Sequence, residues 1–95
     1  MARLIRPDGT EDHVTPANGK TFTLEEMQRY VGGYIELMPG VAPMRMIVDE
    51  EGQLKNKPVN VKATALVFER LKGQKLRYLP TIVGDVLVLE PGERM

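Results

Sequence analysis

Residues 23–37 constrain the fold more than any other stretch, because they hold a helix start, a helix end and the beginning of a strand. Thr23 and Glu26 have the spacing of a capping box, in which each side chain accepts a hydrogen bond from the backbone of the other residue. Gly32 suits the left-handed conformation that ends many helices. The sequence therefore predicts a short helix over 24–31, too short to persist unless its apolar stripe docks on a sheet. That stripe consists of Leu24, Met27, Tyr30 and Val31.

A strand is predicted directly after this helix. Gly33 lets the chain reverse its direction, and residues 34–38 then alternate between apolar and polar. The alternation places Ile35 and Leu37 inward. A turn too short for a crossover separates this strand from residues 44–48, so the two strands are predicted to be antiparallel.

The N-terminal residues predict a hairpin. Residues 3–6 and 11–15 are strand-like, and a Pro-Asp-Gly turn at 7–9 separates them. Proline presets the first corner of such a turn and glycine accepts the left-handed position. The only histidine, His13, is predicted to face solvent on the second arm.

Three consecutive acids, Asp49, Glu50 and Glu51, follow the strand at 44–48. A calcium loop spreads its ligands over about a dozen residues, whereas this run stops at Gly52. We predict a turn with solvated acids and no metal, with residues 53–54 beginning a short returning strand.

A second helix is predicted over 61–72. Asn60 is a favourable N-cap and Gly73 a favourable end. The spacing of apolar residues predicts a buried stripe at positions 61, 65, 68 and 71–72, widened by Leu66 and Val67.

Residues 85–90 form the last predicted strand, which is nearly all apolar and therefore suits a central position. Gly84-Asp85 can be a hairpin turn or a joint into that strand, and we favour the joint. Residues 91–95 are predicted to be a tail. The fold class is therefore α+β: a single domain over 1–95, with a mainly antiparallel sheet, two helices and the order β-β-α-β-β-α-β.

Composition excludes several kinds of chemistry. The chain has no cysteine, no serine and one histidine, so a histidine-activated serine or cysteine nucleophile and a multi-histidine zinc site are excluded. No apolar run reaches the length of a membrane span, and the first six residues lack a signal-peptide core. We expect a non-enzymatic protein of the cytoplasm without a cofactor.

Charge is unevenly distributed although the net charge is zero. Residues 55–77 contain seven bases and one acid, Glu69, which gives this segment a charge of +6. A solvated surface is the favoured interpretation, and an anion-binding surface is the alternative. The bases are Lys55, Lys57, Lys62, Arg70, Lys72, Lys75 and Arg77.

Four blocks of sequence, taken together, carry a resemblance. They read VGGYIE, IVDEEG, PVN followed by AT, and IVGDVLV, and they lie at 31–36, 47–52, 58–64 and 82–88. In this order they resemble a family of small domains encoded by phages and mobile elements, which has no assigned biochemical function. The resemblance implies an accessory protein that acts in the bacterial host cytoplasm, and it implies no catalytic residue.

Three functions follow as hypotheses. The first is a binding protein that occludes a host protein or complex, for instance as an antagonist of a defence system. Exposed methionines are expected to supply adaptable apolar contacts. The candidates are Met38, Met44 and Met46.

The second hypothesis is a homo-oligomer that sequesters a nucleotide or another small molecule. Polar residues and glycines at the junctions between elements would supply its hydrogen bonds, charge and stacking. The predicted ligand-binding residues are Tyr34, Asn60, Lys62, Thr64, Gly84 and Asp85.

The third hypothesis is nucleic-acid binding through the basic segment 55–77. Phosphate contacts would make such binding depend steeply on salt. The zero net charge of the chain argues against it.

Overall fold

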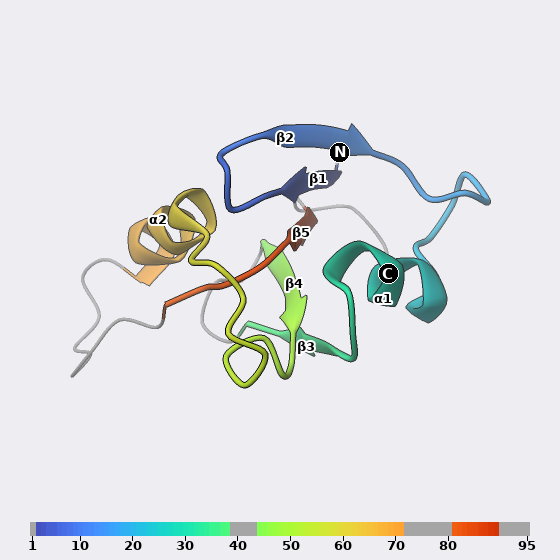
Figure 1. Cartoon of the computed structure of the whole chain (residues 1–95). Coiled ribbons are helices and arrows are strands. Elements are labelled where there is room, and N and C mark those ends of the chain that lie inside the picture. Colours follow the sequence, from blue (N-terminus) through green and yellow to red (C-terminus); the bar gives the residue numbers. More distant parts are fainter. Residues whose placement is uncertain (1, 39–43, 72–80, 90–95) are drawn as a thin grey trace.

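The computed structural model describes residues 2–38, 44–71 and 81–89. The turn predicted at 39–43, the helix end predicted at Gly73 and the tail predicted at 91–95 lie outside the described residues. Figure 1 shows seven elements, which are β1 (Ala2–Ile5), β2 (Glu11–Val14), α1 (Leu24–Val31), β3 (Ile35–Leu37), β4 (Arg45–Asp49), α2 (Val61–Leu71) and β5 (Val86–Leu89).

The strands form one sheet in the order β2-β1-β5-β4-β3, and every neighbouring pair is antiparallel. The predicted α+β class and the order β-β-α-β-β-α-β are confirmed. The last strand, β5, lies in the middle of the sheet, where Leu87 pairs with Leu4 on one side and with Ile47 on the other. Gly84 is a joint that leads into β5, because Val83 before it forms an isolated bridge with Val59 and no hairpin with β5.

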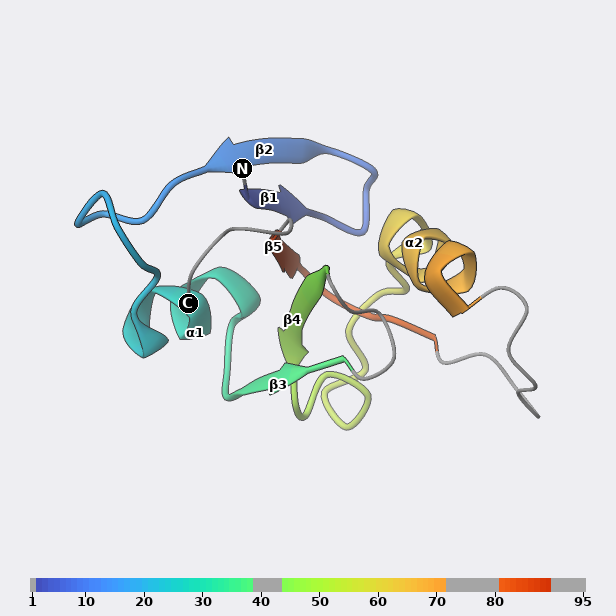
Figure 2. The same ribbon diagram turned by 180° about the vertical axis from the view of Figure 1, so that it is seen from behind.

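The two helices cover opposite faces of the sheet (Figures 1 and 2). Alternation along β5 assigns the sides, since successive residues of a strand point to opposite faces. Leu87 and Leu89 pack with α1, whereas Val86 and Val88 pack with α2. The apolar sequence of β5 is thereby explained, because both of its faces are buried.

Local sequence signals define α1 as predicted. The Thr23 hydroxyl accepts a hydrogen bond from Glu26 N–H at 3.1 Å, and the Glu26 carboxylate accepts one from Thr23 N–H at 3.2 Å. The helix ends at Gly32, which has a left-handed φ of 83°. Both the capping box and the glycine end are confirmed.

Helix α2 is capped as predicted, but it buries a different stripe from the one predicted. Asn60 Oδ1 accepts from Ala63 N–H at 3.1 Å and caps the helix. The residues that pack on the sheet are Ala63, Val67 and Leu71. Val61 and Phe68, predicted to be buried, are 70% and 47% exposed.

The physical reason is that hydrogen bonds fix the first turn of α2 in rotation. Asn60 is fully buried and bonded to neighbouring strands, so residues three or four positions apart from it face inward. The spacing of apolar residues alone predicted that Val61 and Phe68 face the sheet. The hydrogen bonds of Asn60 rotate the helix so that both residues face solvent.

Three further predictions are wrong in detail. Met44 and Met46 are buried rather than exposed, because they belong to the core cluster below α2, and Met38, just after β3, packs partly against that cluster. Residues 50–56 form turns and no returning strand. Leu37 was predicted to face inward, but it is 46% exposed, because it lies on the edge strand β3.

Candidate functional site

Two of the predicted ligand-binding residues fasten α2 to the sheet. Asn60 Nδ2 donates to the carbonyl oxygens of Ile5 and Gly84, at 2.9 and 2.8 Å. The Thr64 hydroxyl accepts from Ile82 N–H at 3.0 Å. Asn60 is completely buried, so it has no surface from which to contact a ligand.

The other four predicted ligand-binding residues lie in different surroundings from Asn60 and Thr64. Lys62 Nζ is 2.9 Å from Glu11 Oε2, and Asp85 lies near enough to Arg6 for their charges to attract. Gly84 has a φ of 75°, and a Cβ there would lie 2.7 Å from the Lys57 side chain.

Tyr34, just before β3, is 66% exposed. The six residues therefore do not converge on one site, and ligand binding by them stays a prediction.

The basic segment is partly neutralised by a buried acid. The Asp49 side chain is 1% exposed, and its Oδ2 lies 2.9 Å from Lys55 Nζ and 2.6 Å from Lys57 Nζ. The lysines also donate to the end of α1, Lys57 to Val31 O at 2.7 Å and Lys55 to Gly32 O at 3.3 Å. The expectation that this acid is solvated is wrong.

Asp49 remains ionised inside this cluster. Burial by itself raises the pKa of the Asp49 carboxyl, but hydrogen bonds from the ammonium groups of Lys57 and Lys55 and from Glu51 N–H lower it to about 2. Gly33 lies close to this cluster, since a Cβ there would lie 2.5 Å from Lys55 Nζ and 3.0 Å from the Asp49 carboxylate oxygens, so that the end of Lys55 would have to shift. We assign this cluster to structure, because its members satisfy one another.

The other predicted bases are placed differently. Arg70 is exposed on α2, whereas Lys72, Lys75 and Arg77 lie outside the described residues. Among the described bases of the patch, Lys55 and Lys57 are therefore held by Asp49, whereas Lys62 and Arg70 are exposed on α2.

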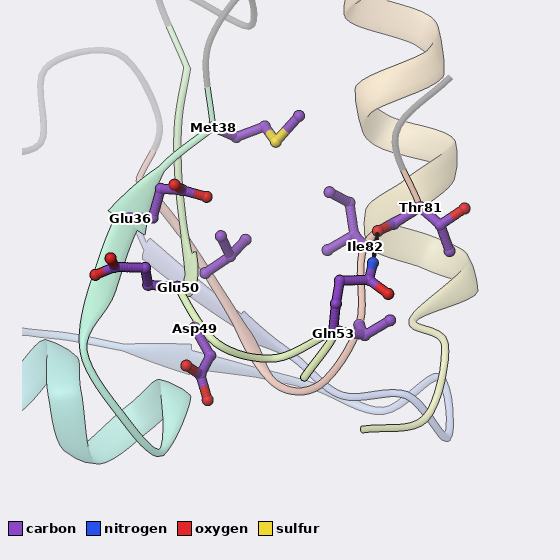
Figure 3. Close-up of a pocket in the computed structure, with 9 residues that line it drawn as sticks. Glu36, Met38, Asp49, Glu50, Gln53, Thr81 and Ile82 are labelled. Carbon is purple, nitrogen blue, oxygen red and sulfur yellow. Dashed lines mark hydrogen bonds between the residues drawn. The ribbon is translucent and has the colours of Figure 1, made fainter. Parts of the chain in front are cut away.

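A hollow of about 190 Å³ lies on the α2 side of the sheet, between β3 and the segment that precedes β5 (Figure 3). Apolar side chains contribute to its lining. Gln53 Nε2 donates to Thr81 O at 2.9 Å and joins two parts of its rim. We call this feature the hollow; it is lined by Glu36, Met38, Val48, Asp49, Glu50, Gln53, Thr81, Ile82 and Val83.

Two carboxylates give the hollow its charge. Both residues are exposed. Glu36 projects from β3 to the side on which Met38 and Ile82 lie, whereas the Glu50 carboxylate, just after β4, lies at the outer edge and points away from them (Figure 3). In the part of the chain that the structure describes, neither carboxylate has an ion pair or a hydrogen bond, unlike the carboxylate of Asp49. The hollow therefore offers negative charge beside an apolar surface.

The sequence only partly signalled this site. Alternation correctly placed Glu36 outward, and the run of acids included Glu50. Nothing in the local sequence indicated that Gln53 and Thr81, 28 residues apart, join at one rim. Within residues 2–38, 44–71 and 81–89, no three acidic or histidine side chains are grouped so as to hold a metal.

The fold defines a class: a small α+β domain with one antiparallel sheet between two helices. A family model matches residues 2–95, and the chain belongs to that family, which is described as Domain of unknown function (DUF3846). No curated protein matches the chain, and no solved structure does. Among the described helices, none combines the length and apolarity needed to cross a bilayer.

Proposed function

We propose that this protein is a non-enzymatic binding protein whose hollow receives a basic side chain of a protein partner. The observation that carries the proposal is the hollow itself, where Glu36 and Glu50 border apolar side chains. Lysine and arginine have an apolar stem and a cationic end. Met38, Val48 and Ile82 would contact the stem, and the carboxylates would form charge-assisted hydrogen bonds with the end.

Exposed apolar residues near the hollow in sequence support a protein partner rather than an isolated amine. Leu54, next to Gln53, is 81% exposed, and Tyr34 precedes Glu36 by two residues and is 66% exposed. Protein interfaces are enriched in aromatic side chains and in arginine, with polar groups at the rim. A partner with an apolar surface and one protruding base fits these features.

The charge of the hollow favours a protein partner over a nucleotide. Carboxylates repel phosphate groups, and the nearby bases Lys55 and Lys57 are already held by Asp49. Sequestration of a nucleotide and binding of nucleic acid remain predictions with less support from this geometry.

The resemblance to domains of phages and mobile elements supplies the setting of the proposal. We propose an accessory protein that acts in the bacterial host cytoplasm by occluding a host protein or complex, a defence system being one such target. Binding alone accounts for this action, and no residue is assigned a catalytic role.

Affinity capture tests the proposal. The immobilised chain, incubated with a host lysate, should retain a specific protein, whose binding is then measured with purified material. Charge reversal by Glu36→Lys and Glu50→Lys together should weaken binding at least tenfold, because it replaces attraction by repulsion.

Glu25→Lys is the matched control, since Glu25 is an exposed acid on α1 at the opposite face of the sheet. It should leave binding unchanged. If the chain retains no specific protein, or if the double variant binds as tightly as the original chain, the proposal is wrong.

A further inference from the structure

The outer face of α2 carries a set of residues arranged symmetrically about Ala65. Val61, Ala65 and Phe68 are four and three residues apart, and Lys62, Ala65 and Glu69 are three and four residues apart, so both sets share one face of the helix. All five residues are exposed. The face thus has a small residue in its centre, an apolar side chain at each end of one flank and opposite charges at the two ends of the other.

We propose that this face binds a second copy of the chain, with the two α2 helices antiparallel. A two-fold axis that passes beside Ala65 places the start of one helix against the end of the other, and each contact then occurs twice. Val61 of one copy faces Phe68 of the second copy. On the other flank, Lys62 faces Glu69 of the second copy.

The chemistry of each position fits this arrangement. Ala65 is small enough to let the helix axes approach to about 8–10 Å, the usual distance between packed helices. Phe68 and Val61, now 47% and 70% exposed, would bury apolar surface. The charges are complementary only when the helices are antiparallel, because a parallel two-fold pair would place Lys62 against Val61 and Glu69 against Phe68 of the second copy.

The contact within the chain is compatible with the dimer. Lys62 Nζ already bonds Glu11 Oε2 at 2.9 Å, and the Lys62 side chain is 50% exposed. An ammonium group has three donors, so it can keep Glu11 and also bond Glu69 of the second copy. In the described part of the chain, the Glu69 carboxylate has no ion pair or hydrogen bond.

The dimer is expected to be weak. One helix of eleven residues paired with its copy buries less than the roughly 1,200 Å² that marks the lower limit of standard interfaces. Association should therefore be visible at high micromolar concentration, and sedimentation velocity should follow it from about 10 µM to about 1 mM, which spans Kd values typical of weak complexes.

Charge reversal gives a test with an internal rescue. Lys62→Glu alone and Glu69→Lys alone each place like charges together in a homodimer, and each should weaken association at least fivefold. When the two variants are mixed, both ion pairs form between unlike chains, and the dimer should return. Arg70→Glu is the control, because Arg70 is exposed on α2 but lies outside the pairing, and it should associate like the original chain.

The outcomes are distinct. A mass that stays at that of one chain up to about 1 mM, or single variants that do not associate on mixing, would overturn the proposal. Phe68→Glu gives a second test, since it should abolish association while leaving the circular dichroism spectrum unchanged. The variant with Glu36→Lys and Glu50→Lys should still dimerise, so failure of the hollow and failure of the dimer can be told apart.

Discussion

The two helices of this domain teach different lessons about what a sequence encodes. Helix α1 takes its start from Thr23 and Glu26 and its end from Gly32, all within or next to the helix. Helix α2 takes its rotation from Asn60 and Thr64, which bond residues that lie far away in sequence. Local signals thus suffice to place α1, whereas α2 depends on the sheet around it.

The two helices also differ in how much of the predicted apolar stripe each one buries. Of the stripe predicted for α1, Met27 and Val31 are buried on the sheet and Tyr30 packs against them, whereas Leu24 at the helix start is 55% exposed and was wrongly predicted to be buried. The stripe predicted for α2 includes Val61 and Phe68, which remain in solvent. Helix α2 therefore leaves more of its predicted apolar stripe in solvent than α1 does, and this difference can be tested by substitution.

The largest expected effect is at the cap of α2. Asn60→Ala removes the cap and leaves the buried carbonyl groups of Ile5 and Gly84 without their donor. We expect a loss of about 3 kcal/mol in the free energy of unfolding, measured with urea, because each orphaned buried group costs about 1–3 kcal/mol. A loss of about 1 kcal/mol, the size of a cap alone, would show that the distant bonds contribute little.

The next effect concerns the end of α1, which the lysines bonded to Asp49 hold in place. The pKa of the Asp49 carboxyl is about 2, whereas an ordinary aspartate carboxyl has a pKa of 3.8. A carboxyl whose pKa is lower in the folded chain than in the unfolded chain stabilises the fold at pH values above its unfolded pKa. This stabilisation is lost as the pH falls through the folded pKa. Asp49→Asn should therefore cost roughly 2 kcal/mol at pH 7.

The difference between Asp49→Asn and the original chain should shrink as pH falls from about 5 to about 2, as followed by urea unfolding at several pH values. Glu51→Gln is the control, since Glu51 is exposed and should show no comparable change. A constant difference across this range would contradict the assigned ion pairs.

Adjacent residues on α2 sharpen the comparison further. Val67 is completely buried and Phe68 is 47% exposed. Val67→Ala should lower the free energy of unfolding by roughly 2 kcal/mol, from lost burial and the cavity that remains. Phe68→Ala should change it by less than about 0.5 kcal/mol at concentrations where the chain is monomeric. Equal losses at the two positions would show that α2 is rotated differently.

Among the substitutions expected to destabilise the fold measurably, the smallest loss is at the cap of α1. Thr23→Ala removes one hydrogen bond at the helix start and should cost about 1 kcal/mol in urea unfolding. Thr23→Ser, which keeps the hydroxyl, should restore most of it. A loss as large as that of Asn60→Ala would remove the distinction between a local cap and one tied to distant strands.

The sequence was most informative where neighbours in the chain are neighbours in space. The capping box, Gly32 and the N-terminal turn are local, and so the order of elements was predictable. Asp49 was misread as solvated because its partners, Lys55 and Lys57, reach it only after the turns at 50–56 fold back. The hollow was unpredictable as a site for the same reason, since Gln53 meets Thr81 through tertiary contact alone.

The central place of β5 bears on when the domain is able to fold during synthesis. Both of its neighbours, β1 and β4, leave the ribosome earlier, and neither can pair across the middle of the sheet until residues 86–89 have emerged. The sheet therefore stays open until β5 has been synthesised, and until then the apolar strands β1 and β4 are accessible to chaperones.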